Sequence, residues 1–150
     1  MQGFKEIEEY DKLKTKVLKY VLYKKRTEQE IWQKFAEYES ETLNEIIDYL
    51  KENNYIDDKR YIEKAVKEFM ALKNMSIKEL KYKLLSKGLK STLIDDYISL
   101  NKEELEEFEL NSANRLYLKK QREMQEDEII NYLRKKGYKE ETIRSIQNNE

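Results

Sequence analysis

Thr27-Glu28-Gln29-Glu30-Ile31 opens a pattern that the sequence repeats at Ser76-Ile77-Lys78-Glu79-Leu80 and again at Gln125-Glu126-Asp127-Glu128-Ile129. The three segments start 49 residues apart, and the apolar positions that follow them stay in register. A period of this length is typical of an array of similar supersecondary units, because each unit buries its apolar face against its neighbours. Function is therefore expected on a long repeated surface rather than in one deep pocket.

The composition indicates a chain made of helices. The 150 residues include no proline and only three glycines, and 41% of them are charged, which leaves little material for tight β-turns. Apolar residues make up 39% and aromatic residues 11%, too much for a disordered protein. We expect an all-α fold of three tandem three-helix repeats, forming an elongated array that can curve. Residues 1–9 form an N-terminal extension, and the repeats are 10–55, 56–100 and 101–150.

Capping residues mark the expected ends of the helices. A Ser or Thr followed three residues later by Glu forms a reciprocal capping box, and this pattern starts at Thr27 and at Ser76. Ser91 is expected to cap a shorter helix. Gly88 and Gly137 suit the left-handed residue that ends a helix, because glycine has no Cβ to clash there.

The segment Tyr55-Ile56-Asp57-Asp58 has a structural interpretation and a chemical one. In the first, Tyr55 and Ile56 fill the junction between two repeats, while Asp57 or Asp58 caps the next helix. In the second, the two carboxylates bind a metal, but without a wider set of oxygen ligands they are poor evidence for such a site. We favour the first interpretation, and we assign Trp32 to the core or to a repeat junction.

Missing residue types exclude several kinds of chemistry. The chain has no cysteine and no histidine, which excludes thiolate or imidazole zinc sites, nucleophiles paired with histidine and histidine acid–base catalysis. It also lacks a phosphate-binding glycine loop, so we expect no enzyme, no cofactor and no small-molecule substrate. No apolar stretch approaches the ~18–20 residues that span a bilayer, and the N-terminus lacks the layout of a signal peptide. A cytoplasmic protein without a membrane partner is expected.

A formal net charge of −1 conceals alternating blocks of charge. Residues 59–90 sum to +7 and residues 91–110 to −6, so each repeat has a basic first half and an acidic second half. One interpretation is that helices pair opposite charges for solubility; the other is a periodic basic face for a polyanion. With a pI near 5.9, such a face needs a partner protein to bring DNA close. The candidate partner- or DNA-binding residues are Lys24, Lys25, Arg26, Lys78, Lys81, Lys83, Lys87, Lys119, Lys120, Arg122, Arg134, Lys135 and Lys136, with Tyr82 and Tyr132 as stacking rings.

Three kinds of segment resemble one protein family in order and spacing. Lys25–Ile31 matches a basic residue, Thr/Ser, Glu, any residue, Glu and Leu at the start of a helix. Asn54–Tyr61 matches Gly-Tyr-Ile-Asp-Asp followed by Tyr, with asparagine in place of the glycine. Leu84–Leu89 and Leu133–Tyr138 match endings with Leu, Lys-Gly and an apolar residue. Together they resemble the RecX family, bacterial regulators of the RecA recombinase, over nearly the whole chain.

One segment departs from the family pattern. Where the family often has a Gly-Pro type turn and a basic residue, this chain has Lys73-Asn74-Met75-Ser76. If that basic residue contacts the partner, the contact must come here from Lys73 or Lys78, or it is lost.

The resemblance implies a function as well as tandem three-helix repeats. It implies a protein that binds the RecA filament on single-stranded DNA and suppresses ATP hydrolysis, strand exchange and coprotease activity, in DNA repair and SOS control. The expected partners are the RecA filament and, within it, single-stranded DNA, and a monomer is expected. The alternatives are a DNA-binding transcription regulator with a helix-turn-helix, and a helical-repeat scaffold that binds protein only.

Overall fold

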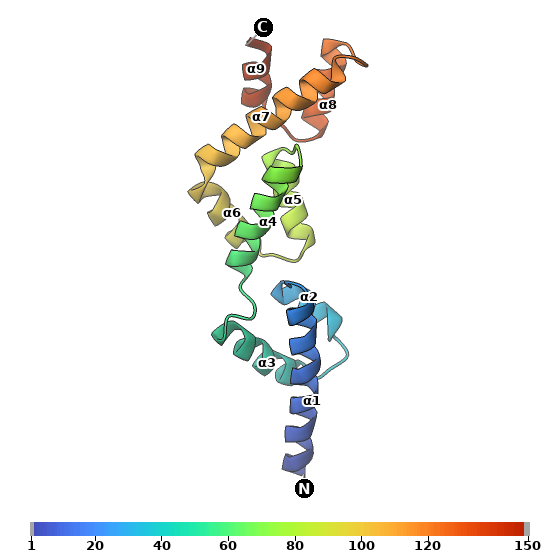
Figure 1. The fold of residues 1–150 in the computed structure, drawn as a ribbon, viewed down its shortest axis with the longest axis vertical. Coiled ribbons are helices and arrows are strands. Elements are labelled where there is room, and N and C mark those ends of the chain that lie inside the picture. The colour runs from blue at the N-terminus through green and yellow to red at the C-terminus, as the bar shows by residue number, and fades with distance from the viewer. Residues whose placement is uncertain (1, 149–150) are drawn as a thin grey trace. The chain divides into compact units, whose positions relative to one another are not determined.

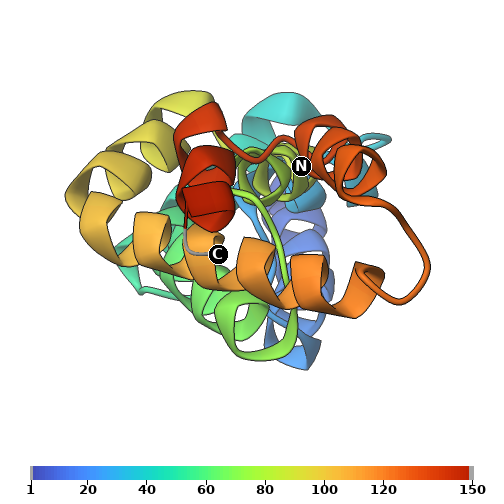
Figure 2. The same ribbon diagram turned by 90° about the horizontal axis from the view of Figure 1, so that it is seen from above.

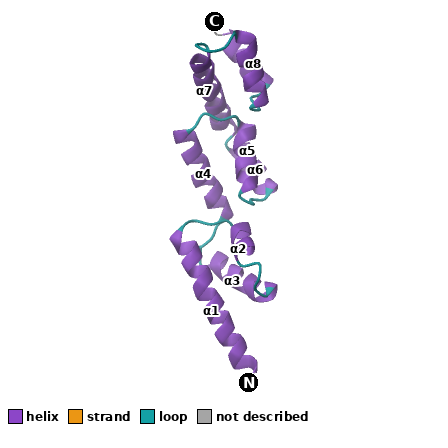
Figure 3. Cartoon of the chain, turned by 90° about the vertical axis from the view of Figure 1, so that its right-hand side faces the viewer, coloured by secondary structure: helices purple, strands orange, loops and turns teal. Residues whose placement is uncertain are grey.

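A computed structural model describes residues 2–148, which fold into helices with no strand in that range (Figures 1 and 3). The all-α prediction is confirmed. The helices are α1 (Gln2–Tyr23), α2 (Glu28–Lys34), α3 (Ser40–Glu52), α4 (Asp58–Leu72), α5 (Ile77–Ser86), α6 (Ser91–Leu100), α7 (Lys102–Lys120), α8 (Glu126–Lys135) and α9 (Glu140–Asn148).

The described chain divides into two units. Unit 1 contains the residues up to Tyr61 together with Lys87–Leu89, and unit 2 contains Ile62–Ser86 and the residues from Lys90 onward. The division into three repeats stays a prediction.

The core of unit 1 is built from the apolar faces of α1, α2 and α3. Leu13, Val17 and Val21 lie one turn apart on α1 and are buried, as the helical spacing predicts. Trp32 is half-buried against this core, in agreement with its assignment to packing. Residues 2–9 of the predicted N-terminal extension lie within α1, and there Phe4 and Ile7 are exposed.

Both predicted capping boxes are present. The Glu30 amide donates to the Thr27 hydroxyl oxygen (3.1 Å), and the Thr27 amide donates to the Glu30 carboxylate (3.1 Å). The corresponding distances at Ser76 and Glu79 are 3.0 and 3.1 Å. These bonds satisfy amides at the start of a helix that have no partner within it.

The prediction for Ser91 is wrong. Ser91 is the first helical residue of α6, and the capping position belongs to Lys90, whose backbone is extended and which makes no side-chain capping bond. A serine hydroxyl caps a helix only from the extended position before the first turn, so Ser91 comes one residue too late. By contrast, Gly88 and Gly137 have φ values of +83° and +93°, which confirms them as left-handed helix ends.

Helix α7 is central to unit 2, where it contacts α5, α6, α8 and α9. Figure 2 shows α9, in red, lying across α7, in orange. The buried Glu109 side chain of α7 accepts hydrogen bonds from the Ile77 amide (3.0 Å) and the Thr142 hydroxyl (2.7 Å). One carboxylate therefore joins α7 to the start of α5 and to α9.

Candidate nucleic-acid interface

Four lysines of unit 2 gather beside two aromatic rings. The ammonium groups of Lys73 and Lys83 lie 6.0 and 5.5 Å from the centre of the Phe69 ring. Those of Lys120 and Lys136 lie 5.2 and 5.4 Å from the centre of the Tyr132 ring. Cations at such distances are attracted by the negative face of the ring. We name this group the lysine cluster; it consists of Phe69, Lys73, Lys83, Lys120, Tyr132 and Lys136.

The helices explain why these residues meet. Lys73 follows Phe69 by four residues, and Lys136 follows Tyr132 by four, so each lysine lies one turn beyond its ring on the same helix face. The Lys73 amide still bonds the Phe69 carbonyl (2.9 Å), and the Lys136 amide bonds the Tyr132 carbonyl (3.1 Å), so both pairs keep helical geometry. Lys83 comes from α5 and is the second lysine beside the Phe69 ring.

The positive charges of the cluster repel one another. The pKa of Lys83 is lowered, first by the Lys73 amine within hydrogen-bonding reach, then by burial and by the charge of Lys73, with Lys136 adding a smaller effect. Glu79 opposes this shift. It lies 3.9 Å from Lys136, and Glu123 lies 3.9 Å from Lys120, both at the limit of an ion pair. Crowded ammonium groups with little compensating charge are stabilised by a bound anion.

The cluster can therefore hold phosphates, and exposed rings nearby can stack on bases. Tyr82, on α5 next to Lys83, is 74% exposed and available for stacking. Tyr132 is half-buried, and two lysine ammonium groups lie within 5.4 Å of its ring centre. Tyr82 is the more exposed of the two rings and is therefore the better stacking residue.

Three other predicted cations are engaged in ion pairs. Lys81 bonds Asp95 (2.7 Å) on α6, and Arg134 bonds Glu140 (2.6 Å). Arg26 packs on the Tyr20 ring (3.9 Å to its centre) and lies 4.0 Å from Glu30. These three contribute less free positive charge to a polyanion than their number in the sequence suggests.

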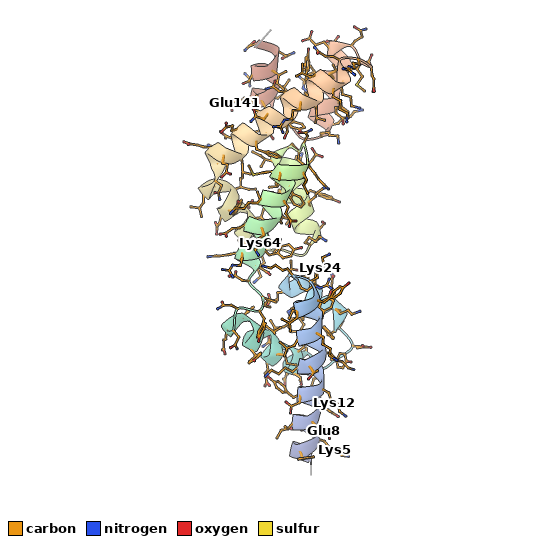
Figure 4. The ribbon with its side chains drawn as sticks, viewed as in Figure 1. Lys5, Glu8, Lys12, Lys24, Lys64 and Glu141 are labelled. Carbon is orange, nitrogen blue, oxygen red and sulfur yellow. The ribbon has the colours of Figure 1, made fainter. Side chains whose placement is uncertain are left out.

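The remaining predicted cations lie outside the ring contacts. The side chain of Lys78 lies against Gly137, and Lys87 accepts a hydrogen bond through its main-chain carbonyl. Lys24 lies at the C-terminal end of α1 (Figure 4). The others are exposed: Lys25, Lys119, Arg122 and Lys135. Of the predicted set, the structure thus brings together Lys83, Lys120, Lys136 and Tyr132.

Sequence reasoning missed Phe69 as a member of the site and placed Lys73 only as a possible substitute contact. Phe69 continues the helical spacing of the buried Ile62 and Val66 on α4, yet it is only half-buried. An aromatic residue followed by lysine four positions later occurs at 69/73 and 132/136, but the same spacing also occurs at 10/14, 20/24 and 55/59, so it does not single out the site.

The two adjacent carboxylates serve helix ends. Asp57 accepts from the Arg60 amide (3.3 Å), which confirms it as the cap of α4. Asp58 instead accepts from the Glu28 amide (3.2 Å) at the start of α2. Within the described residues, no three acidic, cysteine or histidine side chains are placed to hold a metal ion. None of the described helices is long and apolar enough to cross a bilayer.

Sequence comparison finds relatives over most of the chain, although no family model matches it. A protein of Clostridium tetani named regulatory protein RecX is 30% identical over 151 residues, covering 95% of this chain and 69% of the relative. A regulatory protein RecX of Staphylococcus carnosus is 29% identical, with coverage of 88% and 51%. The chain therefore spans between about half and about seven tenths of the length of these relatives.

Two solved structures share the fold. The crystal structure of RecX from Lactobacillus salivarius has a TM-score of 0.82 and 22% identity, covering 95% of this chain and 97% of that one. A crystal structure of regulatory protein RecX has a TM-score of 0.85 and 22% identity, covering 98% of this chain and 77% of that one. The helical fold is thus shared along almost the whole chain.

Proposed function

The chain belongs to the RecX family of regulatory proteins, and from this membership we infer that it regulates the RecA recombinase. We propose that it binds the filament that RecA forms on single-stranded DNA and suppresses ATP hydrolysis, strand exchange and coprotease activity. It acts in DNA repair and SOS control as a cytoplasmic monomer. It is not an enzyme, because it works by occupying a surface of the filament.

The lysine cluster is the observation that supports a role for DNA in this binding. Lys83 has a lowered pKa because Lys73 crowds it, and a phosphate between the two ammonium groups relieves that repulsion. Each phosphate that is neutralised also releases counterions, which makes binding favourable at low salt. An overall acidic protein gains from such a local site only when a partner holds the DNA close, as the RecA filament does.

The test is ATP hydrolysis by the cognate RecA on single-stranded DNA, titrated with this protein at ratios well below one per RecA. We expect inhibition at such ratios, because one regulator on a filament affects several subunits. The double variant Lys83→Glu/Lys136→Glu should require several times more protein for the same inhibition. Lys64→Glu, an exposed charge reversal on α4, is the matched control and should behave as the unchanged protein (Figure 4).

Both alternatives predict no effect on RecA in this assay, and DNA binding distinguishes them from each other. A protein-only scaffold would leave RecA ATP hydrolysis unchanged at every ratio and would not bind single-stranded DNA. A transcription regulator would bind one duplex sequence far better than others and would also leave RecA unaffected. Either result would contradict the proposed function.

A further inference from the structure

A second basic and aromatic site lies in unit 1, away from the residues of the lysine cluster in the sequence. A hollow of about 500 Å³ is formed by the end of α1, the turn between α3 and α4, and the first turn of α4. Four cations line it, Lys24, Lys25, Arg26 and Arg60, while Asp57 is its single carboxylate. Because four cations face one carboxylate, the hollow has an excess of positive charge.

Two of these cations are available to a ligand. Lys24 and Arg60 are exposed, and within the described residues their side chains make no hydrogen bond or ion pair. Arg26, by contrast, packs on Tyr20 and faces Glu30, so it forms a fixed wall. Lys24 and Arg60 are therefore the residues expected to meet an anion.

The hollow also presents tyrosine rings, and one of them is fixed in place. Tyr55 is 43% exposed, and its ring stacks on Tyr49 with 6.3 Å between the ring centres and 26° between the planes. The turn before it has Asn54 at φ 58°, and the Tyr55 amide bonds the Leu50 carbonyl (2.8 Å). A partly exposed ring held by a neighbouring ring and a closed turn is a prepared stacking surface.

We propose that this hollow binds one nucleotide of single-stranded nucleic acid, with the base against Tyr55 and the phosphate on Lys24 and Arg60. Its volume lies in the range of pockets that enclose a ligand of nucleotide size. A flat ring beside free cations matches a base linked to a phosphate better than it matches an acidic peptide, which has charge but no planar ring to stack. The choice of nucleic acid rests on the proposed function.

The test measures binding without RecA, by fluorescence anisotropy of labelled five-residue oligonucleotides. One probe is oligothymidylate, the second has the same phosphates but no bases, and an oligoglutamate peptide is the third. We expect the thymidylate to bind between about fivefold and about a hundredfold more tightly than the abasic probe, the range for stacking of one base. The assays are repeated in the Lys83→Gln/Lys136→Gln background, which weakens binding at the lysine cluster by removing two of its four charges.

Three variants divide the contributions. Tyr55→Leu should abolish the preference for bases, and Tyr55→Phe should retain it, because stacking needs the ring and not the hydroxyl. Arg60→Gln should weaken both nucleic-acid probes by the same factor, while Lys64→Gln, the matched control, should leave both unchanged. If Tyr55→Leu lowers the unfolding temperature, Arg60→Gln still tests the site, since within the described residues the Arg60 side chain makes no hydrogen bond or ion pair.

Equal affinity for the abasic probe and the thymidylate would overturn the proposal, as would tighter binding of oligoglutamate. Unchanged binding in Arg60→Gln would overturn it too. The outcome is separate from that of the proposed function. Binding that depends on Tyr55, without any effect on RecA, would support the nucleotide site and contradict the proposed function. Inhibition of RecA together with nucleotide binding that does not depend on Tyr55 or Arg60 would contradict only the nucleotide site.

Discussion

The hydroxyl of Ser76, at the start of α5, donates a 2.7 Å hydrogen bond to the main-chain carbonyl of Lys136, at the end of α8. In unit 1, the hydroxyl of Thr27 makes the equivalent 2.8 Å bond to the carbonyl of Lys87. Carbonyls in the last turn of a helix have no partner within that helix, so each bond satisfies one of them. Both partners of the Ser76 bond lie 49 residues after those of the Thr27 bond, as a repeat requires, whereas Gln125 makes no side-chain capping bond.

Replacing Ser76 with alanine should therefore destabilise the protein in two ways. Ser76→Ala removes the cap of α5 and leaves the Lys136 carbonyl without its partner, for a combined loss of roughly 1–3 kcal/mol in the free energy of unfolding. Urea denaturation followed by circular dichroism measures it. Ser91→Ala is the matched control, because the Ser91 hydroxyl caps nothing, and it should change stability by less than about 0.5 kcal/mol. Equal effects of the two substitutions would contradict this role of Ser76.

The glycine next to this bond should tolerate no side chain. Gly137 has a φ of +93°, and a Cβ built there would lie 2.9 Å from the Cβ of Lys78 and 3.2 Å from the Ser76 hydroxyl. Gly137→Ala should cost at least about 1 kcal/mol from backbone strain alone. Gly3→Ala is its opposite, because Gly3 lies in α1 with nothing within 4 Å, and alanine there should stabilise the protein by up to about 1 kcal/mol. In thermal unfolding, we expect a lower unfolding temperature for Gly137→Ala and a higher one for Gly3→Ala. A higher unfolding temperature for Gly137→Ala would refute the argument.

These local features could be predicted because they depend on neighbours in the sequence. The capping boxes at Thr27 and Ser76 need only a glutamate three residues later, and the left-handed glycines need only their place after a helix. The prediction for Ser91 was wrong because α6 begins one residue earlier than expected, a difference that helix propensity alone does not resolve. That the Ser76 hydroxyl also bonds Lys136 could not be seen, since it depends on how distant helices pack.

The candidate site was predictable only in part for the same reason. Basic residues at Lys83, Lys120 and Lys136 could be identified from clustering in the sequence. Their contacts with rings could not, because these contacts join residues of α4, α5, α7 and α8. Lys81 and Arg134 looked equivalent to them, and only the fold shows that carboxylates on neighbouring segments bind both.

Asp58 should make stability depend on pH in an unusual direction. Burial raises its pKa above the ordinary value, so the folded state binds the proton more tightly than the unfolded state. Stability from this group is then present at low pH and is lost as pH rises through the raised pKa. Asp58→Asn keeps an oxygen for the Glu28 amide but has no proton to lose. Its stability relative to the unchanged protein should therefore increase as pH rises from about 4, the ordinary value for aspartate, through the raised pKa of Asp58.

Urea midpoints of both proteins at several pH values in that window measure the difference. Asp96→Asn, an exposed change of the same charge on α6, should show no such trend. A relative stability of Asp58→Asn that falls as pH rises would show that the ion pair around Glu28 and Lys51 outweighs burial.

Anion binding at the lysine cluster should weaken at alkaline pH earlier than an ordinary lysine predicts. Lys73 lowers the pKa of Lys83 in the free protein, and a bound phosphate raises it again because it stabilises the ammonium group. Binding therefore takes up a proton, and affinity falls as pH rises through the pKa of free Lys83. Lys73→Gln removes one positive charge, so this variant should bind the anion more weakly than the unchanged protein at pH 7. It also removes the main cause of the lowered pKa of Lys83, so its affinity should begin to fall only at a higher pH. Anisotropy of a labelled oligodeoxyadenylate, whose bases do not titrate in this range, measures both profiles between pH 7 and about 10. Lys64→Gln should reproduce the unchanged profile, and a fall at the same pH with and without Lys73 would show that the two lysines do not act on each other.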